Sequence, residues 1–148
     1  MDISGTFNLK MDPRKAWDLL NDVAVLQACI PGCKSLKATG PDSYEAELSA
    51  GVGPVRGAYR GSVKLMDRKA PTSYRMIVEG SGAAGFIKGE GTITLVPGAT
   101  GGTTVSVTGT AEAGGMIARV GQRLIAGAAN QMLNQFFGCL GKQARVSP

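Results

Sequence analysis

Residues 103–128, TTVSVTGTAEAGGMIARVGQRLIAGA, change their hydrophobic period halfway along the segment. As far as Ala111, apolar and polar residues alternate, which is typical of a β-strand with one buried face. After Gly114–Gly115, apolar residues recur every three or four positions, which predicts a helix. The apolar positions of that helix are Ile117, Val120, Leu124, Ala128, Met132, Phe136 and Leu140. The sequence therefore predicts a last strand followed by one long C-terminal helix.

The alternating pattern also occurs earlier, in residues 3–9, 44–50, 55–65, 73–79 and 87–95, and strand-and-turn patterning begins at Cys33. Asp12 before Pro13 is an N-cap followed by a proline at the first helical position. A second short helix, around residues 23–28, should end by Pro31. The order is one strand, two short helices, six strands and a long helix. It predicts an α+β fold, with a curved seven-stranded antiparallel sheet wrapped around the long C-terminal helix, in a single domain over residues 1–148.

The composition excludes several kinds of chemistry. The chain has no histidine, the commonest general base and the commonest zinc ligand. Its eleven acidic residues fall mostly on outward positions, so no inward carboxylate pair is predicted. The Cys29–Cys33 segment is either half of a metal site or a tight turn, and no second pair of ligands completes it. We therefore predict no catalytic residue, no metal and no cofactor.

Charge and cysteine content predict the setting in which the protein works. The net charge is +5, but the cations are scattered over outward positions without interleaved aromatic residues, so nucleic acid is not an expected partner. A basic protein can also contact an anionic membrane surface. The odd number of cysteines, three, and the lack of a signal peptide predict a reducing, cytoplasmic location. Membrane contact would then be peripheral, on the inner face of the cytoplasmic membrane.

Small residues face one another across the predicted core. Glycine and alanine occupy many inward positions of the strands and of the helix, which either brings the backbones together or leaves space. Because a curved sheet cannot collapse fully onto one helix, we favour a cavity for an apolar small molecule. Its expected lining residues are Tyr44, Leu48, Tyr59, Val63, Met76, Val78, Phe86, Ile93, Val107, Met116, Val120 and Leu124. The tyrosines would hydrogen-bond a ligand carbonyl or serve as ordinary core aromatics.

Three glycine-rich turns are predicted at one end of the sheet, at Gly51–Val55, Gly80–Phe86 and Ala113–Met116. Phe86 and Met116 would guard the mouth of the cavity there and contact a lipid surface or a partner. The alternative is that these two side chains simply plug that end of the barrel.

Seven segments together resemble the family of the carbon monoxide dehydrogenase G subunit. They are ACIPGC (28–33), GPVRG (53–57), RGSV (60–63), PTSYR (71–75), GAAGF (82–86), GGMIA (114–118) and GQR (121–123). The resemblance covers almost the whole chain and implies a START-like, helix-grip (SRPBCC) fold. It also implies an accessory protein that links a molybdenum hydroxylase of the aerobic carbon monoxide dehydrogenase type to the cytoplasmic membrane.

The expected function is that of a non-catalytic carrier or adaptor for a lipid-like ligand. An isoprenoid quinone is the leading hypothesis for this ligand, because such a hydroxylase must pass its electrons on. START-like relatives also include polyketide cyclases and aromatases, so an enzyme acting on a hydrophobic substrate is the alternative from another class. A third alternative is a maturation factor that binds the hydroxylase without any ligand.

Overall fold

The computed structural model of the chain describes residues 1–52, 55–98 and 101–146, and side chains within these ranges except at 50–52, 55–56 and 144–146. The predicted turn at Gly51–Val55 therefore lies partly outside the described residues. The elements are β1 (Asp2–Leu9), α1 (Pro13–Leu20), α2 (Val23–Cys29), β2 (Cys33–Gly40), β3 (Ser43–Val52), β4 (Val55–Lys69), β5 (Ser73–Gly82), β6 (Gly85–Pro97), β7 (Thr103–Gly115), α3 (Met116–Arg119) and α4 (Gln122–Val146).

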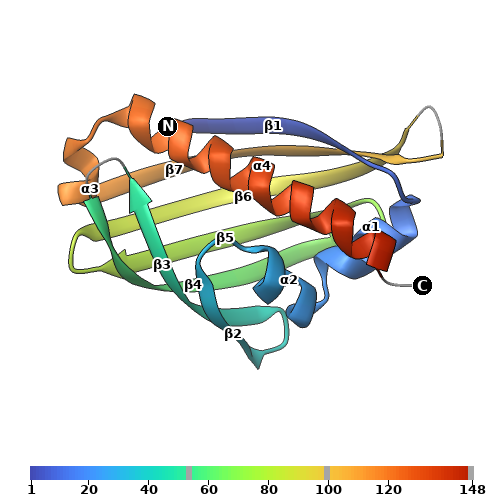
Figure 1. Ribbon diagram of the computed structural model, residues 1–148, viewed down its shortest axis with the longest axis horizontal. Helices are drawn as coiled ribbons and strands as arrows, with labels where there is room; N and C mark the ends of the chain where they lie inside the picture. The colour runs from blue at the N-terminus through green and yellow to red at the C-terminus, as the bar shows by residue number, and fades with distance from the viewer. Residues whose placement is uncertain (53–54, 99–100, 147–148) are drawn as a thin grey trace.

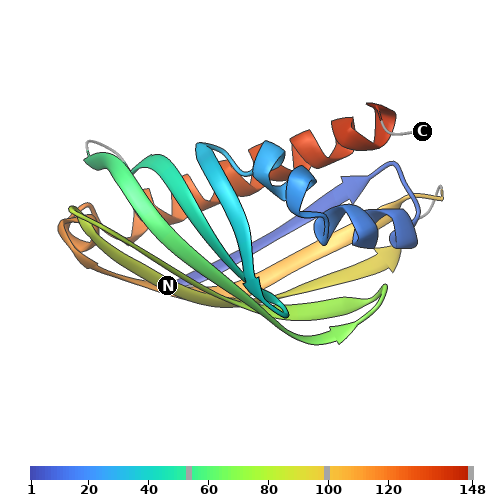
Figure 2. The same cartoon turned by 90° about the horizontal axis from the view of Figure 1, so that it is seen from below.

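The strands form one antiparallel sheet in the order β1-β7-β6-β5-β4-β3-β2. β1 and β2 lie at opposite edges, and α1 and α2 carry the chain between them (Figure 1). The sheet is strongly curved, and α1, α2 and α4 lie on its concave side (Figure 2). The fold class predicted from the sequence, a seven-stranded antiparallel sheet with a long C-terminal helix and two short helices before β2, is confirmed.

Local side-chain chemistry begins the two short helices. The Asp12 carboxylate accepts a hydrogen bond from the Lys15 N–H at 2.8 Å, which caps α1 just before Pro13. The Asp22 carboxylate accepts one from the Ala24 N–H at 3.0 Å and caps α2 in the same way. Each cap satisfies a backbone donor that the first turn of a helix leaves without a partner.

Large apolar side chains fill one end of the concave side, which we call the closed end. The ring of Phe7 stacks on Phe137 of α4 at 4.4 Å between centroids, and Trp17 of α1 meets Tyr74 edge-on at 5.3 Å. The buried cluster consists of Leu9, Met11, Ala16, Trp17, Leu19, Leu20, Leu65, Tyr74, Ile93, Leu95, Val105, Val107, Phe137 and Leu140. The closed end is therefore a packed core that joins α1 and the second half of α4 to the sheet.

The predicted long helix is broken near its start. Gly121 has a φ of 95°, a left-handed conformation that interrupts the helix between α3 and α4. As a result, the helix that was predicted to run from Ile117 begins at Gln122. The buried residue in its first turns is Ile125 rather than Leu124, whose surface is 49% exposed. Within the described ranges no helix is long and apolar enough to cross a membrane.

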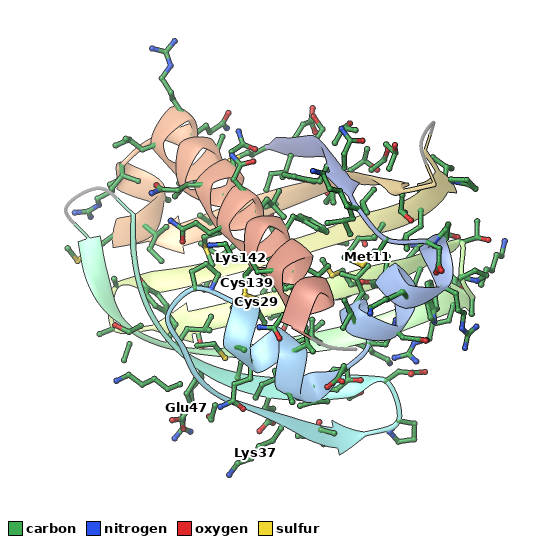
Figure 3. The ribbon with its side chains drawn as sticks, turned by 45° about the vertical axis from the view of Figure 1, so that its right-hand side comes forward. Met11, Cys29, Lys37, Glu47, Cys139 and Lys142 are labelled. Carbon is green, nitrogen blue, oxygen red and sulfur yellow. A yellow bond between two sulfur atoms is a disulfide. The ribbon has the colours of Figure 1, made fainter. Side chains whose placement is uncertain are left out.

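Cys29, the last residue of α2, forms a disulfide with Cys139 of α4 (Figure 3). Their Cα atoms are 5.3 Å apart, although 110 positions separate them in the sequence, and Cys33 is a free thiol. The sequence analysis took the odd number of cysteines as a sign of a reducing location. The count does not support that inference, because one pair is cross-linked and only the third cysteine is left over.

We predict that Phe137→Ala lowers the free energy of unfolding by about 3–5 kcal/mol, because it leaves a cavity in the closed end. Phe86→Ala is the matched control: Phe86 is 40% exposed, so the same truncation should cost about 1 kcal/mol or less. Urea unfolding followed by circular dichroism measures both values. Equal losses for the two variants would show that the closed end is not the principal core.

We predict that reducing the Cys29–Cys139 disulfide destabilises the protein by about 2–5 kcal/mol, since it releases a long loop in the unfolded chain. Urea unfolding with and without reductant measures the difference, and the Cys29→Ser/Cys139→Ser variant should not respond to the reductant. Thiol titration of the protein denatured without reductant should find one thiol per chain. Three thiols would contradict the cross-link.

Candidate functional site

The inward side of the sheet beyond the closed end is lined by small or partly exposed residues, and we call it the open half of the concave face. Its inward positions are Tyr59, Gly61, Val78, Gly80, Ile87, Gly89, Gly91, Gly109 and Ala111, each partly accessible to solvent. Val78 and Gly80 belong to β5, the middle strand of the sheet. An inward side chain on a middle strand is fully buried when a helix covers it, so the partial exposure of Val78 indicates that solvent reaches this half of the concave face.

Two glycines show directly that α4 does not pack onto this surface. A Cβ placed on Gly80 would meet a single atom within 4 Å, the carbonyl oxygen of Arg60 at 3.9 Å. One on Gly61 would meet only the carbonyl oxygen of Glu79 at 3.3 Å. Both contacts are with neighbouring strands, and no atom of α4 is among them. Small residues on β4 and β5 therefore leave room beneath the helix.

The glycines of β6 and β7 have a different role. Gly109 lies opposite Gly91, and a Cβ on Gly109 would collide with the backbone of Glu90 and with Gly91. Glycine is required here because two strands approach closely. The sequence pattern grouped all inward glycines together, and only the structure separates the two roles.

Tyr59 supplies a polar group to the open half. Its ring lies beside Gly82 on β5, where a Cβ would meet the ring at 3.0 Å. Its hydroxyl oxygen is buried and has no hydrogen-bond partner among the described residues. A buried hydroxyl without a partner costs free energy, which a ligand that accepts or donates a hydrogen bond would recover.

The other predicted lining residues fall into three groups. Ile93 and Val107 are buried in the closed end, and Tyr44, Val63 and Met76 border that core. Leu48 and Val78 face inward with partial exposure, and Val120 lies at the break between α3 and α4. Met116 and Leu124 are 56% and 49% exposed on α3 and α4. The structure thus brings Leu48, Tyr59 and Val78 together with the inward glycines, and it places Ile87 and Gly80, which the sequence analysis did not select, beside them.

Phe86 lies on the opposite face of the sheet. In the regular pairing of β6 it shares its face with Lys88, whose ammonium nitrogen is 5.7 Å from the centroid of the Phe86 ring. The ring covers Gly114 on β7, where a Cβ would collide with it. The structure therefore does not bring Phe86 together with the inward residues, and its role at a mouth stays a prediction.

Ionisable groups are nearly absent from the open half. All eleven Asp and Glu residues are exposed, and the described residues contain no cluster of His, Cys, Asp and Glu that could hold a metal ion. Burial raises the pKa of the Tyr74 hydroxyl and of the Cys33 thiol above their ordinary values. Both groups are therefore neutral at pH 7. The arrangement offers an apolar surface with one buried hydroxyl, which suits binding rather than acid–base chemistry.

Comparison with known proteins gives a family and a fold. A conserved protein from Geobacillus kaustophilus is 36% identical, with a TM-score of 0.95 over 99% of this chain and 97% of its own. A START superfamily protein from Mycobacterium smegmatis is 10% identical, with a TM-score of 0.76 and 99% of both chains covered. A protein from Thermus thermophilus is 16% identical, with a TM-score of 0.67 and full coverage of both chains. A search of curated proteins returned no match. The family model for the carbon monoxide dehydrogenase G subunit (CoxG) matches residues 5–145, and the chain therefore belongs to the CoxG family, with a START-like fold.

Proposed function

We propose that the chain is a non-catalytic accessory protein of one domain that holds an apolar ligand against the open half of the concave face. The observation that carries this proposal is the free space at Gly80 and Gly61, which α4 does not fill. Interiors normally pack as densely as organic crystals, so an apolar surface left uncovered in a folded domain needs an occupant. Family membership supports an accessory role rather than an independent enzyme.

A quinone with an isoprenoid tail is the ligand that we propose. The tail suits the apolar surface around Val78 and Ile87, and a quinone carbonyl would accept a hydrogen bond from the buried Tyr59 hydroxyl. The partner would be a molybdenum hydroxylase of the carbon monoxide dehydrogenase type, as the family name suggests. The protein would carry the ligand between that enzyme and the cytoplasmic face of the membrane.

A cyclase or aromatase on the same fold would need several polar groups directed at its substrate. The carboxylates are all exposed, Tyr74 is buried in the closed end, and the buried Thr103 hydroxyl is already used in a hydrogen bond to the Met11 carbonyl at 2.7 Å. This distribution favours the carrier over an enzyme. Native mass spectrometry of protein purified without detergent tests both ideas, because a co-purifying lipid-like molecule of constant mass supports a carrier.

We predict that Gly80→Leu blocks ligand binding while the fold survives. The Cβ has room, and the rest of the side chain would extend over the surface that the ligand would occupy. The affinity for a fluorescent isoprenoid quinone should fall at least about tenfold, which corresponds to about 1.4 kcal/mol. Gly91 is a poorer choice, because a Cβ there would meet the Thr108 carbonyl at 3.0 Å and disturb the sheet.

Ser81→Leu is the matched control for Gly80→Leu. Ser81 is the next residue of β5 and is exposed on the outer face of the sheet. The control adds the same leucine side chain to the same strand and should bind the quinone with native affinity. Native affinity in Gly80→Leu would show that the ligand binds elsewhere.

We predict that Tyr59→Phe weakens the binding of a quinone but not the binding of a hydrocarbon of the same length. Without ligand the variant should be as stable as the native protein or slightly more stable, because it removes a buried hydroxyl that has no partner among the described residues. Affinity for the quinone should fall by about two- to twelvefold, the value of one neutral hydrogen bond of about 0.5–1.5 kcal/mol. Affinity for a hydrocarbon of the same chain length should stay the same. An equal loss for both ligands would contradict a hydrogen bond from Tyr59.

A further inference from the structure

The chain bends sharply between α3 and α4, and we call residues 116–124 the elbow. Two isoleucines hold it from the inside: Ile117 is fully buried, and Ile125, directly after the elbow, is 6% exposed. The N–H of Ile117 donates a hydrogen bond to the carbonyl of Ala84 at 3.1 Å, which ties the elbow to the turn between β5 and β6. That turn follows Gly80, so the elbow stands at the end of the sheet where the open half lies (Figure 1).

The elbow carries both apolar and cationic side chains that are exposed to solvent. Met116 and Leu124 are 56% and 49% exposed, among the most exposed large apolar residues that the structure describes. Arg119 and Arg123 are exposed beside them in the sequence, and neither forms an ion pair within the described ranges. Exposed apolar residues next to such cations form the pattern with which proteins bind the surface of a membrane.

Most of the net charge of the chain falls in residues 113–148, with two cations in the elbow and two, Lys142 and Arg145, near the other end of α4. Residues 1–112 contain all eleven acidic residues and twelve of the sixteen lysines and arginines, for a net charge of +1. Residues 113–148 contain no acidic residue and the remaining four cations, so they carry +4 of the total of +5. No carboxylate in that segment therefore offsets the two arginines of the elbow, and the complementary partner is an anionic surface.

We propose that the elbow is a docking surface for an anionic lipid bilayer. Arg119 and Arg123 contact lipid phosphates while Met116 and Leu124 enter the interface. The inference deepens the proposed function, on which it rests: a bilayer at the elbow faces the end of the sheet that exposes the binding surface. The proposal keeps Met116, which the sequence analysis expected to contact a lipid surface, and it does not use Phe86, whose ring lies on the outer face of the sheet beside Lys88.

The test is sedimentation of the full chain with vesicles of phosphatidylcholine containing a third phosphatidylglycerol, compared with vesicles of phosphatidylcholine alone. The native protein should bind the anionic vesicles more tightly. Binding should weaken as ionic strength rises from about 0.1 M to about 1 M, because the Debye length falls from about 10 Å to about 3 Å. Equal binding to both kinds of vesicle, or no binding to the anionic ones, would overturn the proposal and leave an acidic protein surface as the partner.

Arg119→Gln/Arg123→Gln should lower the partition coefficient about 25-fold, or about fivefold for each arginine, as expected for about 1 kcal/mol per cation near an anionic surface. The matched control is Lys34→Gln/Lys37→Gln, which removes the same charge from two exposed positions of β2. Figure 3 shows Lys37 far from the elbow. The control should bind nearly as the native protein does. An equal loss in both variants would show that net charge alone drives binding, and the elbow would not be the docking surface.

The apolar part is tested with Met116→Ser/Leu124→Ser, which should lower vesicle binding at least about tenfold. Val96→Ser is its control, because Val96 is 45% exposed at the opposite end of β6 and should contribute nothing. Urea unfolding of each variant shows whether a loss reflects unfolding. A folded Met116→Ser/Leu124→Ser variant with native vesicle binding would contradict insertion at the elbow.

Quinone binding in vesicle-free solution separates this inference from the carrier function. Arg119→Gln/Arg123→Gln should keep native affinity for the quinone and lose only the vesicles. A native protein that binds the quinone but no anionic vesicle overturns the docking surface alone. One that binds vesicles through the elbow but takes no quinone overturns the carrier alone.

Discussion

The uneven distribution of side-chain volume along the sheet determines the rest of the structure. At one end, Trp17, Tyr74 and Phe137 fill the space between sheet and helices. At the other end, β4 and β5 present Gly61 and Gly80 to the same side of the sheet. Because α4 is straight and the sheet is curved, the helix cannot follow both surfaces. It packs where the side chains are large and stands away where they are small.

Because of this distribution, the closed end supplies most of the folding stability and the open half supplies the proposed binding surface. Glycine inside a strand weakens it, so the open half contributes little to the free energy of folding. The closed end and the Cys29–Cys139 disulfide offset that cost, and both act on the second half of α4. The first half of α4 is held by Ile125, next to the elbow, and by Leu133, which packs against the buried cluster. Local stability therefore decreases toward the end of the molecule where a ligand would enter.

The proposed functions agree with this difference in packing between the closed end and the open half. An apolar ligand on the open half would supply the side-chain volume that the strands lack, and the Tyr59 hydroxyl would gain a partner that the described residues do not provide. The elbow brings Met116, Leu124 and two arginines to the same end. A membrane bound there would meet the protein where its packing is loosest, so that a lipid-like ligand could pass without crossing the closed core.

The sequence alone determined the strand and helix order, because periods of two and of about 3.6 residues report directly which face of an element is apolar. It also indicated the family, the absence of histidine chemistry and most inward positions of the sheet.

The sequence could not show the helix break at Gly121, since the apolar spacing continues smoothly from Ile117 to Leu124. The pairing of Cys29 with Cys139 has no local signal across 110 residues. Inward glycines look the same in a strand pattern whether they admit a neighbouring strand, as Gly109 does, or leave open space, as Gly80 does. Only the tertiary structure decides between these, because the difference depends on how closely α4 and the neighbouring strands approach each backbone position.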